Sequence, residues 1–101
     1  MGKPTRTVHI RIEGRVQGVG YRAWLEDRAL ASKLEGWVRN RRDGSVEALF
    51  CGPPGVVSEM VALCRHGPPG ARVDNVVSET ANEDALNLRQ AGERFSVLGT
   101  V

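Results

Sequence analysis

The chain has 101 residues, of which 41% are hydrophobic and 26% are charged, and its net charge is +2. This length predicts one domain, residues 1–101, with a single two-layer core. The charge is too small to indicate nucleic-acid binding by itself. No apolar run approaches the ~20 residues of a membrane helix. Residues 1–6 lack the apolar stretch of a signal peptide, so we expect a flexible N-terminal extension on a cytoplasmic protein.

The first predicted elements are a strand and a helix joined by a glycine-rich turn. Val8, Ile10 and Ile12 alternate with polar residues, which is typical of a half-buried strand whose polar face carries His9. Apolar residues then recur at helical spacing over residues 21–34. The sequence therefore predicts a change from period 2 to period 3.6 across the turn.

A hairpin, a second helix and two further strands follow. The pair Asp43-Gly44 is a strong hairpin signal, and apolar residues recur at helical spacing over residues 57–64. The polar segment 81–93 is expected to be a loop. The strands that we expect after the first occupy residues 37–40, 45–51, 71–80 and 94–100.

The predicted order, β-α-β-β-α-β plus a short fifth strand, is that of the α+β ferredoxin-like fold. In this split βαβ arrangement two helices cover one face of an antiparallel sheet, and the third strand lies between the first and second. The first helix, ~18 Å long, runs back along the sheet. The second strand returns ~20 Å. Arg22 and Asn40 should therefore meet at one edge of the sheet.

The glycine turn "EGRVQGVGYR" has the composition of an anion site. Glycine adopts positive φ at no steric cost, so successive backbone N–H groups can point into one concavity. The N-terminus of the following helix adds free N–H groups, and Arg22 adds a planar cation suited to phosphate. The turn is therefore predicted to bind a small tetrahedral oxyanion such as phosphate.

Two better-known phosphate loops fit the turn less well. A Walker A loop needs a lysine followed by serine or threonine, and this turn ends in Arg22. The string from Gly18 to Ala23 matches G-x-G-x-x-A, but a hairpin follows where a dinucleotide fold has another parallel strand and an acidic residue. A purely structural turn with a solvated Arg22 remains the simplest alternative.

Two strings resemble the signatures of the acylphosphatase family. The first, G-x-V-Q-G-V-x-[FY]-R, is filled at every fixed position by "GRVQGVGYR" at residues 14–22. The second, G-[FYW]-V-x-N-x-x-D-G-x-V, is filled by "GWVRNRRDGSV" at residues 36–46 and is followed by Gly52. The resemblance extends over about residues 7–98, which is nearly the whole chain.

The resemblance implies a ferredoxin-like fold and an enzyme that hydrolyses acyl phosphates to a carboxylate and inorganic phosphate. It implies no metal and no organic cofactor. We expect a monomer. The phosphate-binding arginine of the family corresponds to Arg22, and the water-positioning asparagine corresponds to Asn40. The phosphate-binding loop of the family corresponds to the backbone of six residues: Gln17, Gly18, Val19, Gly20, Tyr21 and Arg22. Neither a nucleic-acid partner nor a membrane partner is expected.

Two other classes of function stay open at this point: an anion-binding module without turnover, and an RNA-binding module. Tyr21 and Trp37 are able to stack on bases, although packing in the core or the site wall is the more ordinary role for both. Measured turnover separates the enzyme from both alternatives.

Cys51 and Cys64 match no zinc-binding spacing and are expected to be buried thiols, with their pairing undecided. Three arginines beside Asn40 are expected to be solvated, with a possible part in steering anions to the site. They are Arg39, Arg41 and Arg42.

Overall fold

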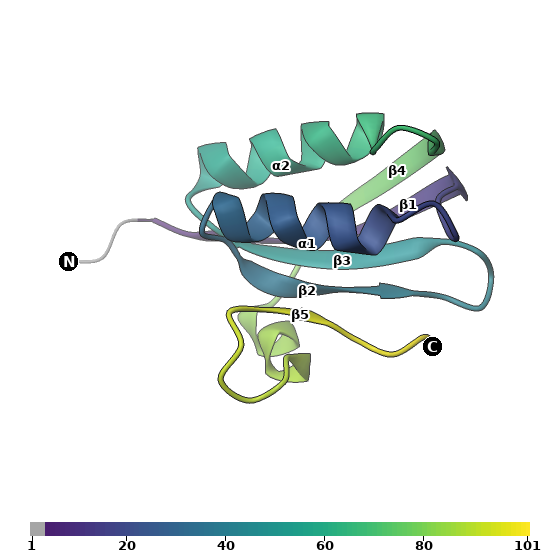
Figure 1. Ribbon diagram of the computed structural model, residues 1–101. Helices are drawn as coiled ribbons and strands as arrows, with labels where there is room; N and C mark the ends of the chain where they lie inside the picture. Colours follow the sequence, from purple (N-terminus) through teal and green to yellow (C-terminus); the bar gives the residue numbers. More distant parts are fainter. Residues whose placement is uncertain (1–3) are drawn as a thin grey trace.

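The computed structural model describes residues 4–101, and its elements follow the predicted order (Figure 1). The helices are α1 (Tyr21–Ala31) and α2 (Pro54–His66). The strands are β1 (Arg6–Arg15), β2 (Glu35–Asn40), β3 (Val46–Gly52), β4 (Arg72–Thr80) and β5 (Phe95–Val97), and a 3-10 helix, η1 (Glu83–Leu88), precedes β5. Of the predicted extension, residues 1–3 lie outside the described residues, and Arg6 already pairs with Gly52 in the sheet.

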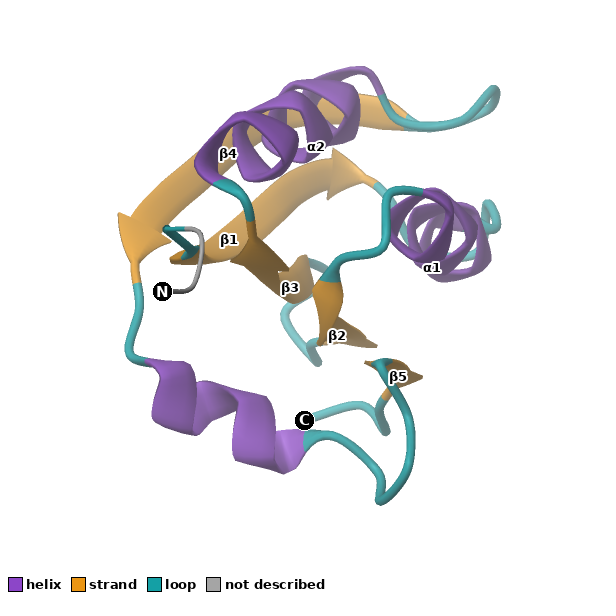
Figure 2. Cartoon of the chain, turned by 90° about the vertical axis from the view of Figure 1, so that its left-hand side faces the viewer, coloured by secondary structure: helices purple, strands orange, loops and turns teal. Residues whose placement is uncertain are grey.

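The five strands form one sheet in the order β4-β1-β3-β2-β5. β3 lies antiparallel between β1 and β2, so these two are parallel to each other, and β4 pairs antiparallel with the outer edge of β1. Both α-helices lie on one face of the sheet (Figures 1 and 2). The predicted ferredoxin-like architecture is confirmed. β5 pairs parallel with β2, so the complete sheet is mixed.

The main hydrophobic core lies between the sheet and the two α-helices. Val8, Ile10 and Ile12 of β1 are at most 1% exposed, as their alternation predicts. The helix side chains buried in this core are Tyr21, Leu25, Ala29, Val57, Met60 and Cys64. Helix α1 ends at Ala31, three residues before the predicted end, and Lys33 then turns the chain with a left-handed φ of 59°.

The prediction that residues 81–93 form a loop was wrong. Six of these residues form η1, which lies on the sheet face opposite the α-helices (Figures 1 and 2). The Trp37 side chain is 2% exposed on this face, and its Nε1 atom donates a hydrogen bond of 2.8 Å to the carbonyl of Ala85 in η1. Leu49 on the neighbouring strand is fully buried. This face therefore carries a second, smaller apolar cluster.

Replacing Leu49 by alanine is expected to lower the free energy of unfolding by ~2–5 kcal/mol, the range for deleting a buried leucine. Leu88→Ala, in η1 but 51% exposed, serves as the control. Its effect should stay within ~0.5 kcal/mol. Urea unfolding followed by tryptophan fluorescence measures both. Equally small losses would contradict the burial of this face under η1.

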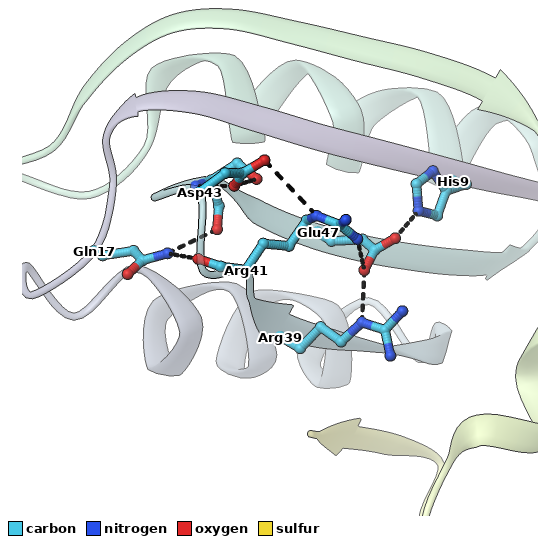
Figure 3. Close-up of polar contacts among 7 residues, drawn as sticks. His9, Gln17, Arg39, Arg41, Asp43 and Glu47 are labelled. Atoms are coloured by element: carbon cyan, nitrogen blue, oxygen red, sulfur yellow. Dashed lines mark hydrogen bonds and ion pairs between the residues drawn. The ribbon is translucent and has the colours of Figure 1, made fainter. Parts of the chain in front are cut away.

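Charged side chains on the same face form a cluster around Glu47 (Figure 3). Glu47 is 6% exposed and accepts hydrogen bonds from Arg39 Nε at 2.6 Å, from Arg41 Nη1 at 3.3 Å and from His9 Nε2. Burial alone would raise the pKa of the Glu47 carboxyl, but the hydrogen bonds and charges of Arg39 and His9 outweigh burial and hold this pKa below its ordinary value. The prediction that Arg39 and Arg41 are solvated was wrong in part, because both donate hydrogen bonds to this buried carboxylate.

Glu47→Gln should lower the free energy of unfolding at neutral pH by ~1–3 kcal/mol, because the variant loses hydrogen bonds to a charged group. The pKa of Glu47 is lower in the folded than in the unfolded chain. The contribution of its charge is therefore complete above the ordinary glutamate pKa of ~4.3 and is lost as the pH falls through the lower folded value.

Chemical denaturation between pH 7 and acid pH measures this dependence. The difference between wild type and Glu47→Gln should shrink on acidification, whereas Glu59→Gln, at an exposed position of α2, should match wild type throughout. A difference that stays constant with pH would contradict the assigned pKa shift.

Candidate active site

The glycine turn and the end of β2 line one cavity of about 300 Å³. Its lining residues are Val16, Gln17, Gly18, Gly20, Tyr21, Arg22, Ala23, Glu26, Asn40 and Val97. Arg22 and Asn40 come from separate elements and are brought to the same cavity, as the lengths of α1 and β2 predict. Val19, which was also assigned to the phosphate-binding loop, does not line the cavity and packs against the core instead.

The backbone of the turn is shaped by two left-handed glycines. Gly18 has a φ of 75° and Gly20 a φ of 79°. A Cβ built at either position meets no atom within 4 Å, so the requirement for glycine is conformational rather than steric. Gly20 is also the N-cap of α1, where no side chain accepts a hydrogen bond from the first helical turn. The turn thus combines a positive helix end with open space in front of it.

Tyr21 fixes the start of α1 against α2. Its ring is 1% exposed, and its hydroxyl donates a hydrogen bond of 2.6 Å to the carbonyl oxygen of Cys64. Burial raises the pKa of Tyr21 far above the ordinary tyrosine value, so the phenol stays neutral at any working pH. The Tyr21 side chain therefore anchors the loop and does not act as an acid or base.

Arg22 supplies the positive charge of the cavity. It lies in the first turn of α1 and is half-buried. Within residues 4–101 its guanidinium forms no ion pair of 4.0 Å or less, although Glu26, one turn later on α1, lines the same cavity. An arginine without a carboxylate partner keeps its full fork of donors for a phosphate.

Asn40 places an acceptor in the cavity. It is the last residue of β2, and its side-chain Oδ1 atom is buried without a hydrogen-bond partner among residues 4–101. The backbone carbonyl of Asn40 accepts a hydrogen bond of 3.2 Å from the N–H of Val101, which fixes the backbone at this residue. A buried, unpaired amide oxygen on a fixed backbone is suited to accept a hydrogen bond from a water or ligand.

The Gln17 side chain has partners that the sequence did not indicate. Its Nε2 atom donates hydrogen bonds of 2.8 Å to the carbonyl of Arg41 and 2.9 Å to the carbonyl of Ser45 (Figure 3). Both acceptors belong to the β2–β3 hairpin, so this side chain joins the glycine turn to the hairpin that carries Asn40. Only the backbone of Gln17 remains available for an anion cradle.

A larger groove of about 790 Å³ lies on the other side of the turn. Glu13, Asp43 and Asp74 line it together with Arg15 and Arg72, and Arg72 pairs with Asp74 at 3.2 Å. Three carboxylates and two arginines line this groove, so its charge does not favour an anion. It contains none of the residues predicted for the site.

The remaining reactive side chains lie away from the cavity. Cys51 and Cys64 are buried, as predicted, and both are free thiols; burial raises the pKa of Cys64 to about 12. No group of three or more His, Cys, Asp or Glu side chains suited to a metal ion occurs within residues 4–101. None of the helices in that range combines the length and the apolar character that a bilayer crossing requires.

Comparison with known proteins identifies the family. The acylphosphatase family model matches residues 8–96. An acylphosphatase of Bradyrhizobium diazoefficiens is 72% identical over 94 residues, which cover 93% of this chain and 95% of that protein. An acylphosphatase of Rhodopseudomonas palustris is 64% identical over 92 residues, which cover 91% and 93% of the two chains.

A solved structure agrees with the sequence comparisons. The crystal structure of acylphosphatase from Bacillus subtilis superposes with a TM-score of 0.79 at 33% identity, covering 94% of this chain and 99% of that chain. The family match includes the glycine turn, both α-helices and the hairpin that carries Asn40. The chain described here therefore belongs to the acylphosphatase family, a family of enzymes.

Proposed function

We propose that this protein hydrolyses the carboxyl-phosphate bond of acyl phosphates, giving a carboxylate and inorganic phosphate. The observation that carries the proposal is the pairing of Arg22 and Asn40 in one cavity. Among the described residues 4–101, the Arg22 guanidinium has no carboxylate partner and the buried amide oxygen of Asn40 has no hydrogen-bond partner. The names of the related proteins support the same reaction. Arg22 and Asn40 are the residues to which we assign the chemistry.

In this proposal the substrate phosphate lies in the turn formed by residues 17–22. The guanidinium of Arg22 donates to two phosphate oxygens, and backbone N–H groups of the turn donate to the others. During transfer the negative charge is spread over the equatorial oxygens of the phosphoryl group. Donors that are already fixed in place stabilise that charge without reorganising.

Asn40 is assigned to hold the attacking water. Its Oδ1 atom accepts a hydrogen bond from one proton of the water, which turns an oxygen lone pair toward phosphorus. The new bond joins the water oxygen to phosphorus, and the bond from phosphorus to the acyl oxygen breaks with its electron pair on the carboxylate. A phosphate oxygen of the substrate takes the water's proton.

The leaving group explains why so few side chains are needed. A carboxylic acid has a pKa of ~4–5, so its carboxylate departs without being protonated. Neither a general acid nor an activated nucleophile is required by this reaction. The buried, high-pKa thiol of Cys64 is accordingly given no role in it.

The burial of the aromatic side chains disfavours the RNA-binding alternative. Tyr21 is 1% exposed and Trp37 is 2% exposed, so neither presents a face on which a base can stack. We propose a cytoplasmic monomer that acts on a small acyl phosphate without a nucleic-acid or membrane partner.

The test of this proposal is the hydrolysis of benzoyl phosphate, followed by absorbance. Wild type should turn over rapidly. Arg22→Ala should lose ~10³-fold or more in kcat/KM, because the charge on the transferring group loses its main cation. Asn40→Ala should lose ~10²-fold or more in kcat, because the water is no longer oriented.

Binding of inorganic phosphate, measured by calorimetry, separates the two roles. Arg22→Ala should no longer bind phosphate, whereas Asn40→Ala should bind it as wild type does. Arg28→Ala and Asn87→Ala, at exposed positions of α1 and η1, are the matched controls and should retain both properties. Full activity of Arg22→Ala, or loss of phosphate binding in Asn40→Ala, would contradict the assigned roles.

Removal of divalent cations should leave the reaction unchanged. The proposed charge stabilisation comes from Arg22 and backbone N–H groups, so no metal ion takes part. Benzoyl phosphate turnover before and after treatment with EDTA is the measurement. Inhibition that is reversed by adding back Mg²⁺ or Zn²⁺ would refute the metal-free mechanism.

A further inference from the structure

We propose that Gln17 is a positioning residue that fixes the phosphate-binding loop relative to Asn40. This role rests on the proposed acyl phosphate hydrolysis. In-line attack requires the reacting atoms ~3–3.5 Å apart and aligned. The phosphate and the water are held by different segments, the glycine turn and the end of β2. A contact that joins these two segments sets the separation on which the rate depends.

Gln17 makes that contact with both of its amide protons. One Nε2–H is donated to the carbonyl of Arg41 at 2.8 Å, and the other to the carbonyl of Ser45 at 2.9 Å. Arg41 directly follows Asn40 in the chain, and Ser45 lies on the other side of the hairpin turn, directly before β3. The Gln17 amide thus holds both arms of the hairpin at the level of Asn40.

The hairpin does not need Gln17 to complete its own hydrogen bonds. The carbonyl of Arg41 also accepts from the N–H of Gly44 at 3.1 Å, and the carbonyl of Ser45 also accepts from the N–H of Arg41 at 2.9 Å. Gln17 uses the second lone pair of each oxygen. Its bonds therefore connect the hairpin to the loop, and the turn keeps its own hydrogen bonds without them.

The same geometry rules out the Gln17 side chain as a hydrogen-bond donor to phosphate. A glutamine amide has two protons, and both are committed to carbonyl oxygens. The remaining Oε1 atom is an acceptor and repels an anion. A direct role in phosphate binding would have to break the contact with the hairpin.

The C-terminal end of β2 is also held by contacts with Glu47, on the sheet face opposite the α-helices. Arg39 and Arg41, the residues on either side of Asn40, both donate to the buried carboxylate of Glu47, at 2.6 Å and 3.3 Å. Gln17 acts on the backbone of Arg41, and Glu47 acts on its side chain. Asn40 is therefore set between neighbours that are fixed from two directions.

The first experiment measures kcat for benzoyl phosphate and the Kd for inorganic phosphate in Gln17→Ala. We expect kcat to fall ~10–100-fold, because a small misplacement of the water relative to phosphorus is costly. The Kd for phosphate should stay close to that of wild type, since Arg22 and the loop backbone remain. Gln90→Ala, which removes an exposed glutamine side chain, should change neither value.

A double-mutant cycle asks whether Gln17 acts through Asn40. If it does, Gln17→Ala should have little further effect on kcat in the Asn40→Ala background, where no amide oxygen is left to position. Thermal unfolding of each variant checks that the fold is intact. Equal losses in both backgrounds would overturn the positioning role, and so would loss of phosphate binding in Gln17→Ala.

Gln17→Glu adds a readout in the pH profile. The glutamate has nearly the same shape, but its ionised form has no proton to donate to the two carbonyls, and its protonated form has one. The kcat of Gln17→Glu, divided by that of wild type, should therefore rise as the pH falls. Gln90→Glu makes the same chemical change at an exposed position and should follow wild type. A pH-independent ratio for Gln17→Glu would overturn the proposal.

Wild-type turnover, measured in the same assay, distinguishes failure of the proposed function from failure of the role assigned to Gln17. If folded wild type binds phosphate but does not hydrolyse benzoyl phosphate, the proposed function is overturned and the role of Gln17 with it. If wild type is active and Gln17→Ala is equally active, only the role of Gln17 is overturned.

Discussion

The parallel arrangement of β1 and β2, with β3 between them, determines where every functional group lies. Because these strands point the same way, the turn that leaves β1 and the residue that ends β2 reach the same edge of the sheet. Helix α1 connects β1 to β2 by running back along the sheet, and it begins at the cavity. The cation, the helix N-terminus and the buried amide of Asn40 therefore converge without any long loop to position them.

The order of the elements and the meeting of Arg22 with Asn40 could be predicted from the sequence, because each signal on which they depend is local. Strand alternation, helical spacing and the Asp43-Gly44 turn fix the lengths of the elements, and those lengths bring Arg22 and Asn40 together. The partners of Gln17 escaped prediction because they are backbone carbonyls, which carry no side-chain signature. The burial of Glu47 also escaped prediction, because it depends on neighbouring strands and on arginines that cover the side chain.

The covering of the second sheet face was missed for a related reason. Residues 81–93 are mostly polar and have no 3.6-residue period, so nothing in them favours a helix. The short 3-10 helix η1 is held by tertiary contacts, among them the hydrogen bond from Trp37 to Ala85. Such a segment is stabilised by the surface that it covers, and its own sequence carries no information about that surface.

The hydrogen bond from Tyr21 to Cys64 links the proposed anion site to the packing of α2. Tyr21 is the first residue of α1 and follows the glycine turn, while its hydroxyl donates a hydrogen bond to a backbone carbonyl of α2. We therefore expect the geometry of the turn and the docking of α2 to be coupled. By thermodynamic linkage, an anion that binds only the docked form shifts the equilibrium toward docking, to the extent that docking improves its affinity. Slower hydrogen exchange in α2 with phosphate bound would be the signature of that coupling, although α2 itself never touches the ligand.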